Sequence, residues 1–345
     1  MDNKIVAIDI GGGTQDIFLY EPGKSVENCI QLILPSPTVM IAEEIYRATE
    51  KGKDIFLHGQ LMGGGPNSRA LGHHLEKGLK AYATPEAAKT FHDNLEKVKK
   101  LGVIITEEAP PAAVPIKTAD LDLDRLSRAL ELYGVSLPTR VAAAVQDHGE
   151  SPNSSNREFR IKHWAQFIEQ GGLLSDLIYQ DIPSYFTRMQ AVQKVHPGAY
   201  LMDTGSAAIW GALCDPYVIP YRESGLVVVN IGNQHTVGVL VKGDRVLGLF
   251  EHHTGLMNRE KLADYVERLR LGELTHQEIF NDRGHGCYIH STYHYSEGDF
   301  QAVVVTGPNR NLVKDLGYHF AVPFGDMMLS GCFGLVAAIK NDVNI

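Results

Sequence analysis

The chain has 345 residues and a formal net charge of −9, with 32 Lys and Arg against 41 Asp and Glu. Because domains typically contain about 100–200 residues, this length predicts roughly two domains and excludes a small disulfide-stapled fold. The acidic balance, with no long basic block, argues against a nucleic-acid partner. No run of about 18 apolar residues occurs, so we expect no membrane partner.

The four cysteines, Cys29, Cys214, Cys287 and Cys332, are scattered and form no CxxC motif. This spacing is typical of reduced thiols, and we expect a cytoplasmic location. It also excludes an iron–sulfur cluster held by three closely spaced cysteines. The N-terminus leads directly into an expected strand, so we expect no signal sequence.

The first expected element is a β-hairpin near the N-terminus. An apolar run from Lys4 to Ile10 is interrupted by Gly11-Gly12-Gly13-Thr14 and resumes from Asp16 to Tyr20. A third strand is expected at 29–34 and a helix at 39–51. This arrangement places Asp9 at the mouth of a glycine turn.

A second glycine loop follows a strand expected at 54–58. It consists of Met62-Gly63-Gly64-Gly65-Pro66 and precedes a helix that begins with Asn67, Ser68 and Arg69. Three glycines before a helix indicate either an anion pocket or a tight connector, and the sequence leaves both open. Beyond it we expect an insertion at about 81–126, with a helical stretch at 85–100.

The last expected strand of the first half, at 140–146, ends in Asp147-His148-Gly149 and is followed by a polar loop at 151–156. The pattern around Asp9 then recurs around Asn230. A strand at 225–231 leads into a glycine turn at 232–236 and a returning strand at 237–241. Further strands at 245–250 and 301–305 and helices at 258–271 and 325–340 complete the second half. The repeat predicts two α/β domains, which we place at 1–195 and 196–345.

These motifs resemble the superfamily of sugar kinases, actin and heat-shock chaperone ATPases (ASKHA). Asp9-Ile10-Gly11-Gly12-Gly13-Thr14 is similar to its first phosphate loop and Asn230-Ile231-Gly232-Asn233-Gln234-His235-Thr236 to its second. The stretch at 205–213 is similar to the helix before the second loop, 304–310 to the adenosine turn, and 324–338 to the closing helix. The resemblance implies two ribonuclease-H-like domains that face each other across a nucleotide cleft, with ATP and Mg²⁺ as cofactors.

More narrowly, the chain resembles an uncharacterised family labelled "pyruvate formate-lyase activating enzyme-related". Activating enzymes of that kind need three clustered cysteines for an iron–sulfur centre, and this sequence has no such cluster. The label therefore gains no support from the residues.

The glycine turns predict phosphate binding, because glycines let backbone N–H groups approach an anion closely. The alternative is a hairpin that needs glycine only for its backbone geometry. Asn230, in place of Asp, adds no charge to attract Mg²⁺ and favours a nucleotide sensor, a degenerate ATPase or another ligand. The candidate nucleotide-binding residues are Gly11, Gly12, Gly13, Thr14, Gly232, Asn233, His235, Thr236, Gly307, Asn309 and Arg310.

Two carboxylates are the candidate catalytic residues. Asp9 is expected to hold Mg²⁺ through water, and Asp147 to act as general base, because a carboxylate at a strand end can orient a hydroxyl or water toward the γ-phosphate. The alternative for Asp147 is a solvated turn. His285, His290 and His294 form a candidate metal site, or else belong to an aromatic-rich surface loop or a substrate lid.

The preferred function is that of an ATP-binding protein that closes on its ligand and transfers the γ-phosphate to a small acceptor or hydrolyses it. One alternative is a non-catalytic, nucleotide-gated regulatory or partner protein, which Asn230 favours. A second is a metal-dependent hydrolase or ligase that uses the histidines. The sequence identifies neither the small-molecule acceptor nor a protein partner.

Overall fold

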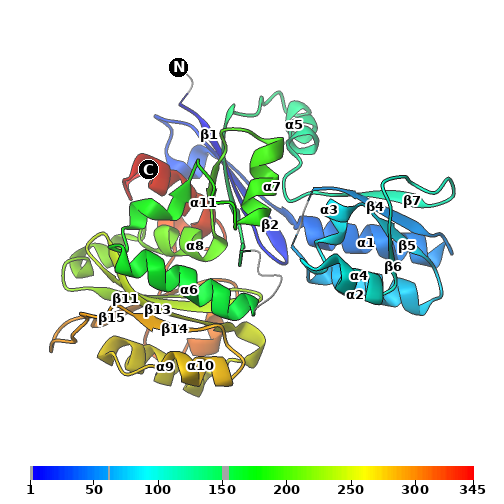
Figure 1. The fold of residues 1–345 in the computed structure, drawn as a ribbon. Coiled ribbons are helices and arrows are strands. Elements are labelled where there is room, and N and C mark those ends of the chain that lie inside the picture. The colour runs from blue at the N-terminus through cyan, green and yellow to red at the C-terminus, as the bar shows by residue number, and fades with distance from the viewer. Residues whose placement is uncertain (1–2, 61–62, 150–154) are drawn as a thin grey trace.

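The computed structural model describes residues 3–60, 63–149 and 155–345. Its strands form three sheets (Figure 1). The first contains β1 (Ile5–Ile10), β2 (Thr14–Tyr20), β3 (Ile30–Pro35), β8 (Arg140–Val145), β9 (Ile178–Tyr179) and β10 (Tyr200–Met202). The second contains β11 (Leu226–Ile231), β12 (His235–Lys242), β13 (Arg245–His253), β14 (Gly286–Ile289), β15 (Ala302–Thr306) and β16 (His319–Phe320). The third contains β4 (Ile55–Gly59), β5 (Ala81–Ala83), β6 (Val103–Ile105) and β7 (Val114–Thr118).

The helices are distributed between and around these sheets. They are α1 (Pro37–Glu50), α2 (Pro66–Glu76), α3 (Pro85–Ala88), α4 (Leu95–Lys100), α5 (Leu123–Glu131), α6 (Asn156–Glu169), α7 (Thr187–Val195), α8 (Thr204–Ala212), α9 (Arg259–Leu271), α10 (His276–Asn281) and α11 (Ser330–Lys340). In the part of the chain that the structure describes, no helix has both the length and the apolar character needed to cross a membrane.

The two larger sheets share one order over five of their six strands. In the first, β2 pairs antiparallel with β1 and β3, while β1 runs parallel to β8 and β8 to β10. In the second, β12 pairs antiparallel with β11 and β13, while β11 runs parallel to β15 and β15 to β16. The same arrangement therefore occurs twice, which confirms the expected pair of ribonuclease-H-like α/β units.

Side-chain alternation assigns each sheet face to a different core. In β1, Ile5 and Ala7 belong to a central core, whereas Val6 and Ile8 face outward to a second core. Strand β11 behaves in the same way, with its even-numbered residues in the central core. Asp9 and Asn230 continue the inward-facing positions of their strands, so both side chains point toward the middle of the molecule.

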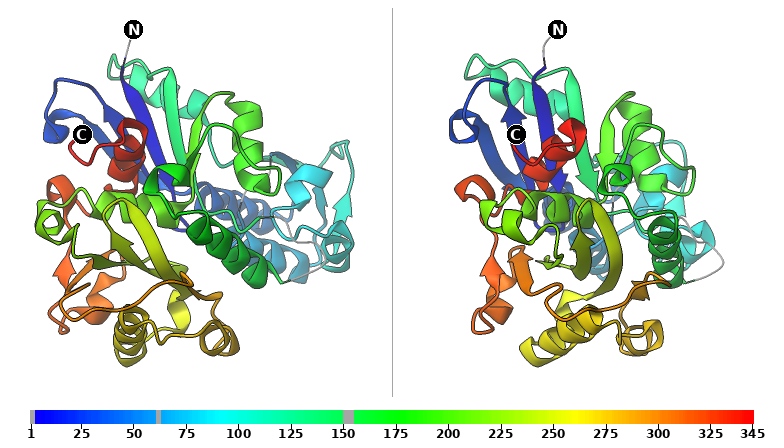
Figure 2. Two further views of the ribbon diagram at one scale, coloured as in Figure 1. Left: turned by 60° about the vertical axis from the view of Figure 1, so that its left-hand side comes forward. Right: turned by 90° about the vertical axis from the view of Figure 1, so that its left-hand side faces the viewer.

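The central core is filled mainly by α8 and α11, which lie between the two six-stranded sheets. Helices α5 and α7 cover the outer face of the first sheet, and α9 and α10 that of the second (Figure 2). Helices α8 and α11 pack backbone to backbone: a Cβ added to Gly334 would lie 2.7 Å from the nitrogen of Gly211 and would overlap the carbonyl oxygen of Ala207.

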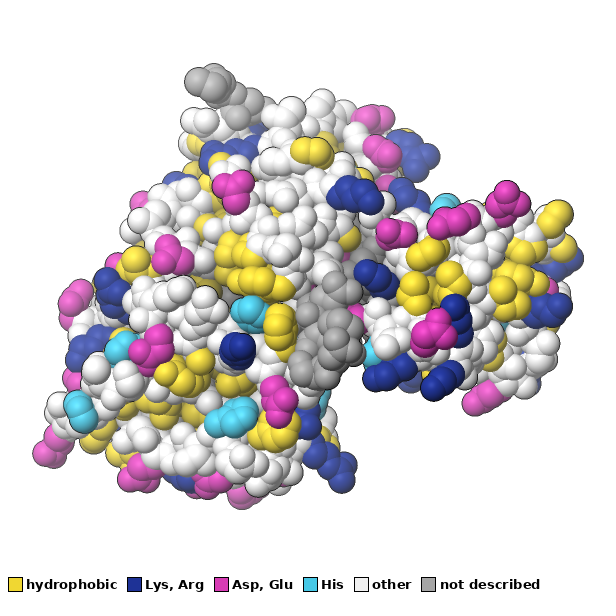
Figure 3. All heavy atoms as spheres, viewed as in Figure 1, with side chains coloured by type: hydrophobic (Ala, Val, Ile, Leu, Met, Phe, Trp, Pro, Cys, Tyr) yellow, Lys and Arg dark blue, Asp and Glu magenta, His cyan; other side chains and the backbone are white. Residues whose placement is uncertain are grey.

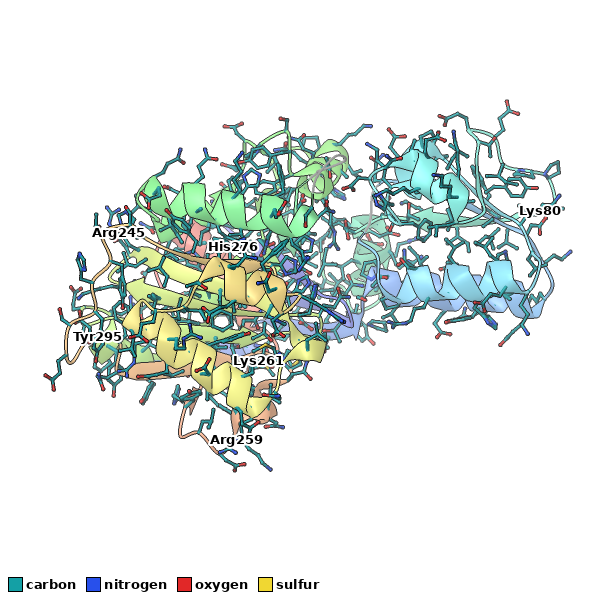
Figure 4. The ribbon with its side chains drawn as sticks, turned by 60° about the horizontal axis from the view of Figure 1, so that its bottom comes forward. Lys80, Arg245, Arg259, Lys261, His276 and Tyr295 are labelled. Carbon is teal, nitrogen blue, oxygen red and sulfur yellow. The ribbon has the colours of Figure 1, made fainter. Side chains whose placement is uncertain are left out.

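The third sheet is all parallel and forms, with α1 to α4, a lobe with its own hydrophobic core. The lobe projects from the body: Lys80 lies at its far end, well away from Arg245 of the second sheet (Figure 4). The outer part of the lobe also stands clear in the space-filling view (Figure 3). The insertion expected at about 81–126 matches this lobe only in part, because the lobe begins at α1 and ends at β7, whereas Leu126 of α5 packs on the first sheet.

Three expected elements differ in detail. The helical stretch at 85–100 is two helices, because the side chain of Asn94 accepts hydrogen bonds from the first turn of α4 and starts a new helix there. The closing helix begins at Ser330 rather than 325, since Phe324 and Gly325 have left-handed φ values of 50° and 81°. Strand β10, beyond residue 195, belongs to the first sheet, and α6 packs on β13 and β14 of the second. The domain boundary itself stays a prediction.

Candidate functional site

A cleft with a volume of about 380 Å³ opens where the glycine turns of the two large sheets meet. This volume lies within the range of about 300–1,000 Å³ that is typical of small-molecule sites. The starts of α8 and α11 complete its lining, together with Gly63 and Gly64 of the second glycine loop. Of the predicted site residues, those that line the cleft are Asp9, Gly11, Gly12, Thr14, Gly232, Asn233, His235 and Gly307.

The two turns have the same backbone geometry. Gly11 N–H donates a hydrogen bond to the carbonyl oxygen of Thr14 at 2.9 Å, and Gly232 N–H donates to that of His235, also at 2.9 Å. The turns also touch each other: a Cβ added to Gly13 would lie 3.1 Å from Nδ2 of Asn233. The expected repeat is therefore a structural one, and its two copies face each other at the cleft.

Carboxylates lie at the base of the first turn. Asp9 and Asp16 are opposite each other on β1 and β2. Burial, with added repulsion from Asp16 and Asp203, raises the pKa of Asp9 well above its usual value, and burial raises the pKa of Asp16 to about 7. Oδ1 of Asp9 is buried and has no hydrogen-bond partner among the described residues. An unpartnered carboxylate oxygen beside further carboxylates suits a hard cation such as Mg²⁺.

An arginine that the sequence did not single out connects the two halves of the site. Arg160 of α6 is buried, donates to both carboxylate oxygens of Asp203 at 2.8 and 2.9 Å, and donates to Oε2 of Glu251 at 2.8 Å. Burial opposes the charge of Glu251, but Arg160 holds the pKa of that carboxyl below its usual range. Asp203 also accepts from Gly205 N–H at the start of α8, so the network fixes one wall of the cleft.

Asp147 is held by backbone groups and does not line the cleft. Its Oδ1 accepts from Gly149 N–H, and its Oδ2 accepts from the N–H groups of Arg188 and Met189, each at 2.9 Å. Burial raises its pKa to about 6, although hydrogen bonds from Met189 and Gly149 act in the opposite direction. The carboxylate thus fixes the first turn of α7, and its expected role as general base stays a prediction.

Arg188 was also missed. Its guanidinium donates to both carboxylate oxygens of Asp120, at 2.9 and 2.6 Å, and to the carbonyl oxygen of Gln146 at 2.8 Å. It lines the cleft beside Gly63, where an added Cβ would lie 2.6 Å from the guanidinium. The absence of a side chain at Gly63 therefore leaves space for the guanidinium of Arg188, which is already paired with Asp120.

Three histidines and a glutamate gather in the same wall. The possible ligand atoms of His148, His235, Glu251 and His285 all lie within 4.8 Å of one another. Burial lowers the pKa of His235 to about 4 and that of His285 to about 3, so both rings are neutral near pH 7. The sequence had paired His285 with His290 and His294.

His290 and His294 lie elsewhere. Nδ1 of His290 accepts from Thr292 N–H at 3.2 Å, and His294 is exposed on the loop after β14. The strand register explains the difference, because β14 pairs with β13 and brings His285 beside Glu251, whereas the chain beyond His290 leaves the sheet.

The remaining predicted nucleotide-binding residues do not line the cleft; they are Gly13, Thr236, Asn309 and Arg310. Thr236 is buried, and its hydroxyl shares a hydrogen bond of 3.0 Å with that of Thr254. The side chain of Asn309 donates to the carbonyl oxygen of Gly232 at 3.0 Å, and the guanidinium of Arg310 lies over the ring of Phe320 at 5.6 Å. Met62 and most of the polar loop at 151–156 lie outside the described residues.

Two ribonuclease-H-like units with paired glycine turns and a carboxylate-lined cleft between them define a protein of the actin-like ATPase fold class. The match to one protein family covers residues 62–312, and that family is described as "Putative pyruvate format-lyase activating enzyme (DUF1786)". The match spans more than half of the chain, so the chain belongs to this family. None of the curated proteins compared with the chain matches it.

The residues of this chain do not fit the iron–sulfur centre that the family description suggests. All four cysteines are buried and free. Among the described residues, the cluster of possible metal ligands contains histidine and glutamate and no cysteine. A cluster of that kind is held by cysteine thiolates, which this site does not supply.

Several solved structures resemble the chain in part. The PilM–PilN type IV pilus biogenesis complex gives a TM-score of 0.38 at 11% identity, over 99% of both chains. The ethanolamine utilization protein EutJ from Carboxydothermus hydrogenoformans gives 0.34 at 12% identity, over 96% of this chain and 88% of that one. The PPX-GPPA enzyme of Aquifex aeolicus gives 0.26 at 13% identity, over 88% and 67%. The fold class is defined by the strand order that the two larger sheets repeat.

Proposed function

We propose that the chain binds ATP, or a closely similar polyphosphate ester, together with Mg²⁺ in the cleft, and that it hydrolyses or transfers the terminal phosphate. The observation that carries this proposal is the pair of equivalent glycine turns that meet at the cleft, with an unpartnered oxygen of Asp9 beside them. Turns of this kind present backbone N–H groups to an anion.

The charges of the cleft explain why a cation belongs to the proposal. Three carboxylates line it, those of Asp9, Asp16 and Asp203, together with the guanidinium groups of Arg160 and Arg188. Both guanidinium groups are already paired with carboxylates. These two guanidinium groups therefore offer little free positive charge to a bare polyphosphate. Mg²⁺ would neutralise phosphate oxygens, with Asp9 holding it through water.

Residues of this chain would then orient the ligand. The turns at 11–14 and 232–235 would contact the phosphates, and the N-terminus of α8, which lines the cleft at Thr204 and Gly205, would add its positive dipole end. Asn230 occupies the position equivalent to Asp9 and brings no charge. This supports the rival reading, a non-catalytic protein gated by nucleotide, in which binding occurs without turnover.

The test is ligand-dependent thermal stabilisation of the full chain. With ATP and Mg²⁺ at 100 times Kd, the wild type should gain about 2.7 kcal/mol of stability, and EDTA should remove that gain. Asp9→Asn should abolish the Mg²⁺-dependent gain. Asp299→Asn, which removes a carboxylate that pairs with Lys242 outside the cleft, should keep it.

The same samples are assayed for phosphate release, alone and with candidate small acceptors. Turnover supports the phosphotransferase or ATPase reading, whereas tight binding without turnover supports the nucleotide-gated rival. The binding proposal is wrong if ATP with Mg²⁺ stabilises Asp9→Asn as much as the wild type, or if neither ATP nor tripolyphosphate stabilises the wild type.

A further inference from the structure

The histidine–glutamate cluster is built from four separate elements. His148 follows β8, His235 begins β12, Glu251 lies in β13 and His285 directly precedes β14. Their possible ligand atoms lie within 4.8 Å of one another. In a tetrahedral site with bonds of about 2.1 Å, the ligand atoms lie about 3.4 Å apart, so inward movements of these side chains by about 1 Å would close a coordination sphere.

Three polar atoms of this cluster have no hydrogen-bond partner among the described residues, although they are buried. They are Oε1 of Glu251, Nε2 of His148 and Nδ1 of His285. The side chain of Glu251 is 0% exposed and that of His285 is 2% exposed. An unsatisfied buried polar group costs about 1–3 kcal/mol, and native structures rarely leave several together. We therefore expect a bound group that is not part of the polypeptide to supply partners for these three atoms.

The charges around the cluster indicate a cation. Arg160 carries one positive charge and contacts two carboxylates, those of Asp203 and Glu251. One buried negative charge is therefore left over beside the histidines. Arg160 donates to Oε2 of Glu251, which leaves Oε1 directed to the cluster, 3.6 Å from Nδ1 of His235. Such an arrangement is typical of a metal-binding carboxylate whose other oxygen is fixed by a neighbour.

Ring packing alone does not account for the arrangement. The rings of His148 and His285 are stacked at 5.1 Å, and that of His235 meets His285 edge-on at 4.7 Å. If packing were the only role of these positions, apolar side chains would serve equally well there. Packing gives no reason for an unpaired glutamate oxygen at their centre.

We propose that His148, His235, His285 and Glu251 bind one divalent transition-metal ion of the class that takes imidazole nitrogen and carboxylate oxygen, such as Zn²⁺ or Fe²⁺. Imidazole ligands favour these ions over Mg²⁺, so the site differs in chemistry and in residues from the one at Asp9. His148 and His235 line the cleft, whereas Glu251 and His285 do not. The ion would therefore lie in the cleft wall, where a bound ligand could reach it as a fifth ligand.

The test uses the full chain, stripped of metal with a chelator and free of nucleotide. Co²⁺ is titrated as a visible probe and then displaced with Zn²⁺. The wild type should bind about one equivalent, with absorption bands of nitrogen- and oxygen-coordinated Co²⁺. His285→Gln and His148→Gln should each weaken binding at least about 10-fold. His294→Gln, at an exposed position, is the matched control and should bind like the wild type.

Asp9→Asn should also keep Co²⁺ binding, so this proposal and the nucleotide proposal fail separately. The metal site is refuted if the wild type takes up no stoichiometric Co²⁺ or Zn²⁺, or if His285→Gln binds within twofold of the wild type. If a histidine variant does not fold, X-ray absorption of the wild-type zinc complex decides. Three imidazole ligands support the site, and a shell of sulfur or of water oxygen alone overturns it.

Discussion

The close packing of α8 and α11 leads to a stability prediction in two matched substitutions. In Gly334→Ala, the new methyl group would lie 2.7 Å from the nitrogen of Gly211, whereas ordinary contacts begin near 3.4 Å. The obstacle is the backbone of a buried helix rather than a flexible side chain. In Gly72→Ala, within α2, the new methyl group meets nothing within 4 Å.

The two substitutions are expected to change the unfolding free energy in opposite directions. Alanine is about 1 kcal/mol more favourable than glycine inside a helix, and this gain applies to both variants. Overpacking a core typically costs about 1–3 kcal/mol, and a clash with backbone on the facing helix belongs at the upper end. Gly334→Ala should therefore lose about 1–2 kcal/mol of unfolding free energy, whereas Gly72→Ala should gain about 0.5–1 kcal/mol.

Urea unfolding measures both effects. Tryptophan fluorescence reports on the buried Trp164 and on Trp210 of α8, and far-UV circular dichroism reports on the whole chain. If Gly334→Ala unfolds at the same urea concentration as the wild type or at a higher one, the two helices do not pack backbone to backbone. A loss in Gly72→Ala would instead contradict the open surroundings of α2.

Two further predictions concern buried charges. Asp215 accepts hydrogen bonds from His319 and from the backbone of Val322, and these outweigh burial and hold its pKa below the usual 3.8. Asp215→Asn should cost about 1–3 kcal/mol at neutral pH. Because a lowered folded-state pKa gives stability that is lost as pH falls below about 3.8, the cost should shrink in acid, and urea titrations at several pH values check this. Arg160→Met should cost about 3–5 kcal/mol, since it leaves two buried carboxylates unpaired, and a loss below about 1 kcal/mol in the same assay would contradict the network.

The parts of the fold that the sequence predicted are those encoded locally. Strand alternation and glycine turns depend on neighbouring residues, so the hairpins at Asp9 and Asn230 and their repetition were readable. The ends of the helices were harder to predict. The apolar pattern continues past the cap at Asn94 and past the left-handed residue Phe324, where the helices are in fact interrupted.

The site was only partly readable because its contacts join distant segments. Arg160 meets Asp203 43 residues away and Glu251 91 residues away, and no spacing rule links them. Sequence proximity grouped His285 with His290 and His294, whereas strand pairing and the end of β8 place it with His148. Asp147 follows a strand end as expected, but backbone N–H groups occupy both of its oxygens, those of α7 on Oδ2 and that of Gly149 on Oδ1.

The repeat also has an asymmetry with a consequence for recognition. The two turns match in backbone, yet Asp9 stands on one strand where Asn230 stands on the other. A ligand held between the two turns meets a carboxyl group on one side and an uncharged amide on the other. A ligand whose two ends differ in charge can then bind in one orientation only. The scaffold, although nearly twofold symmetric, therefore fixes the orientation of its ligand.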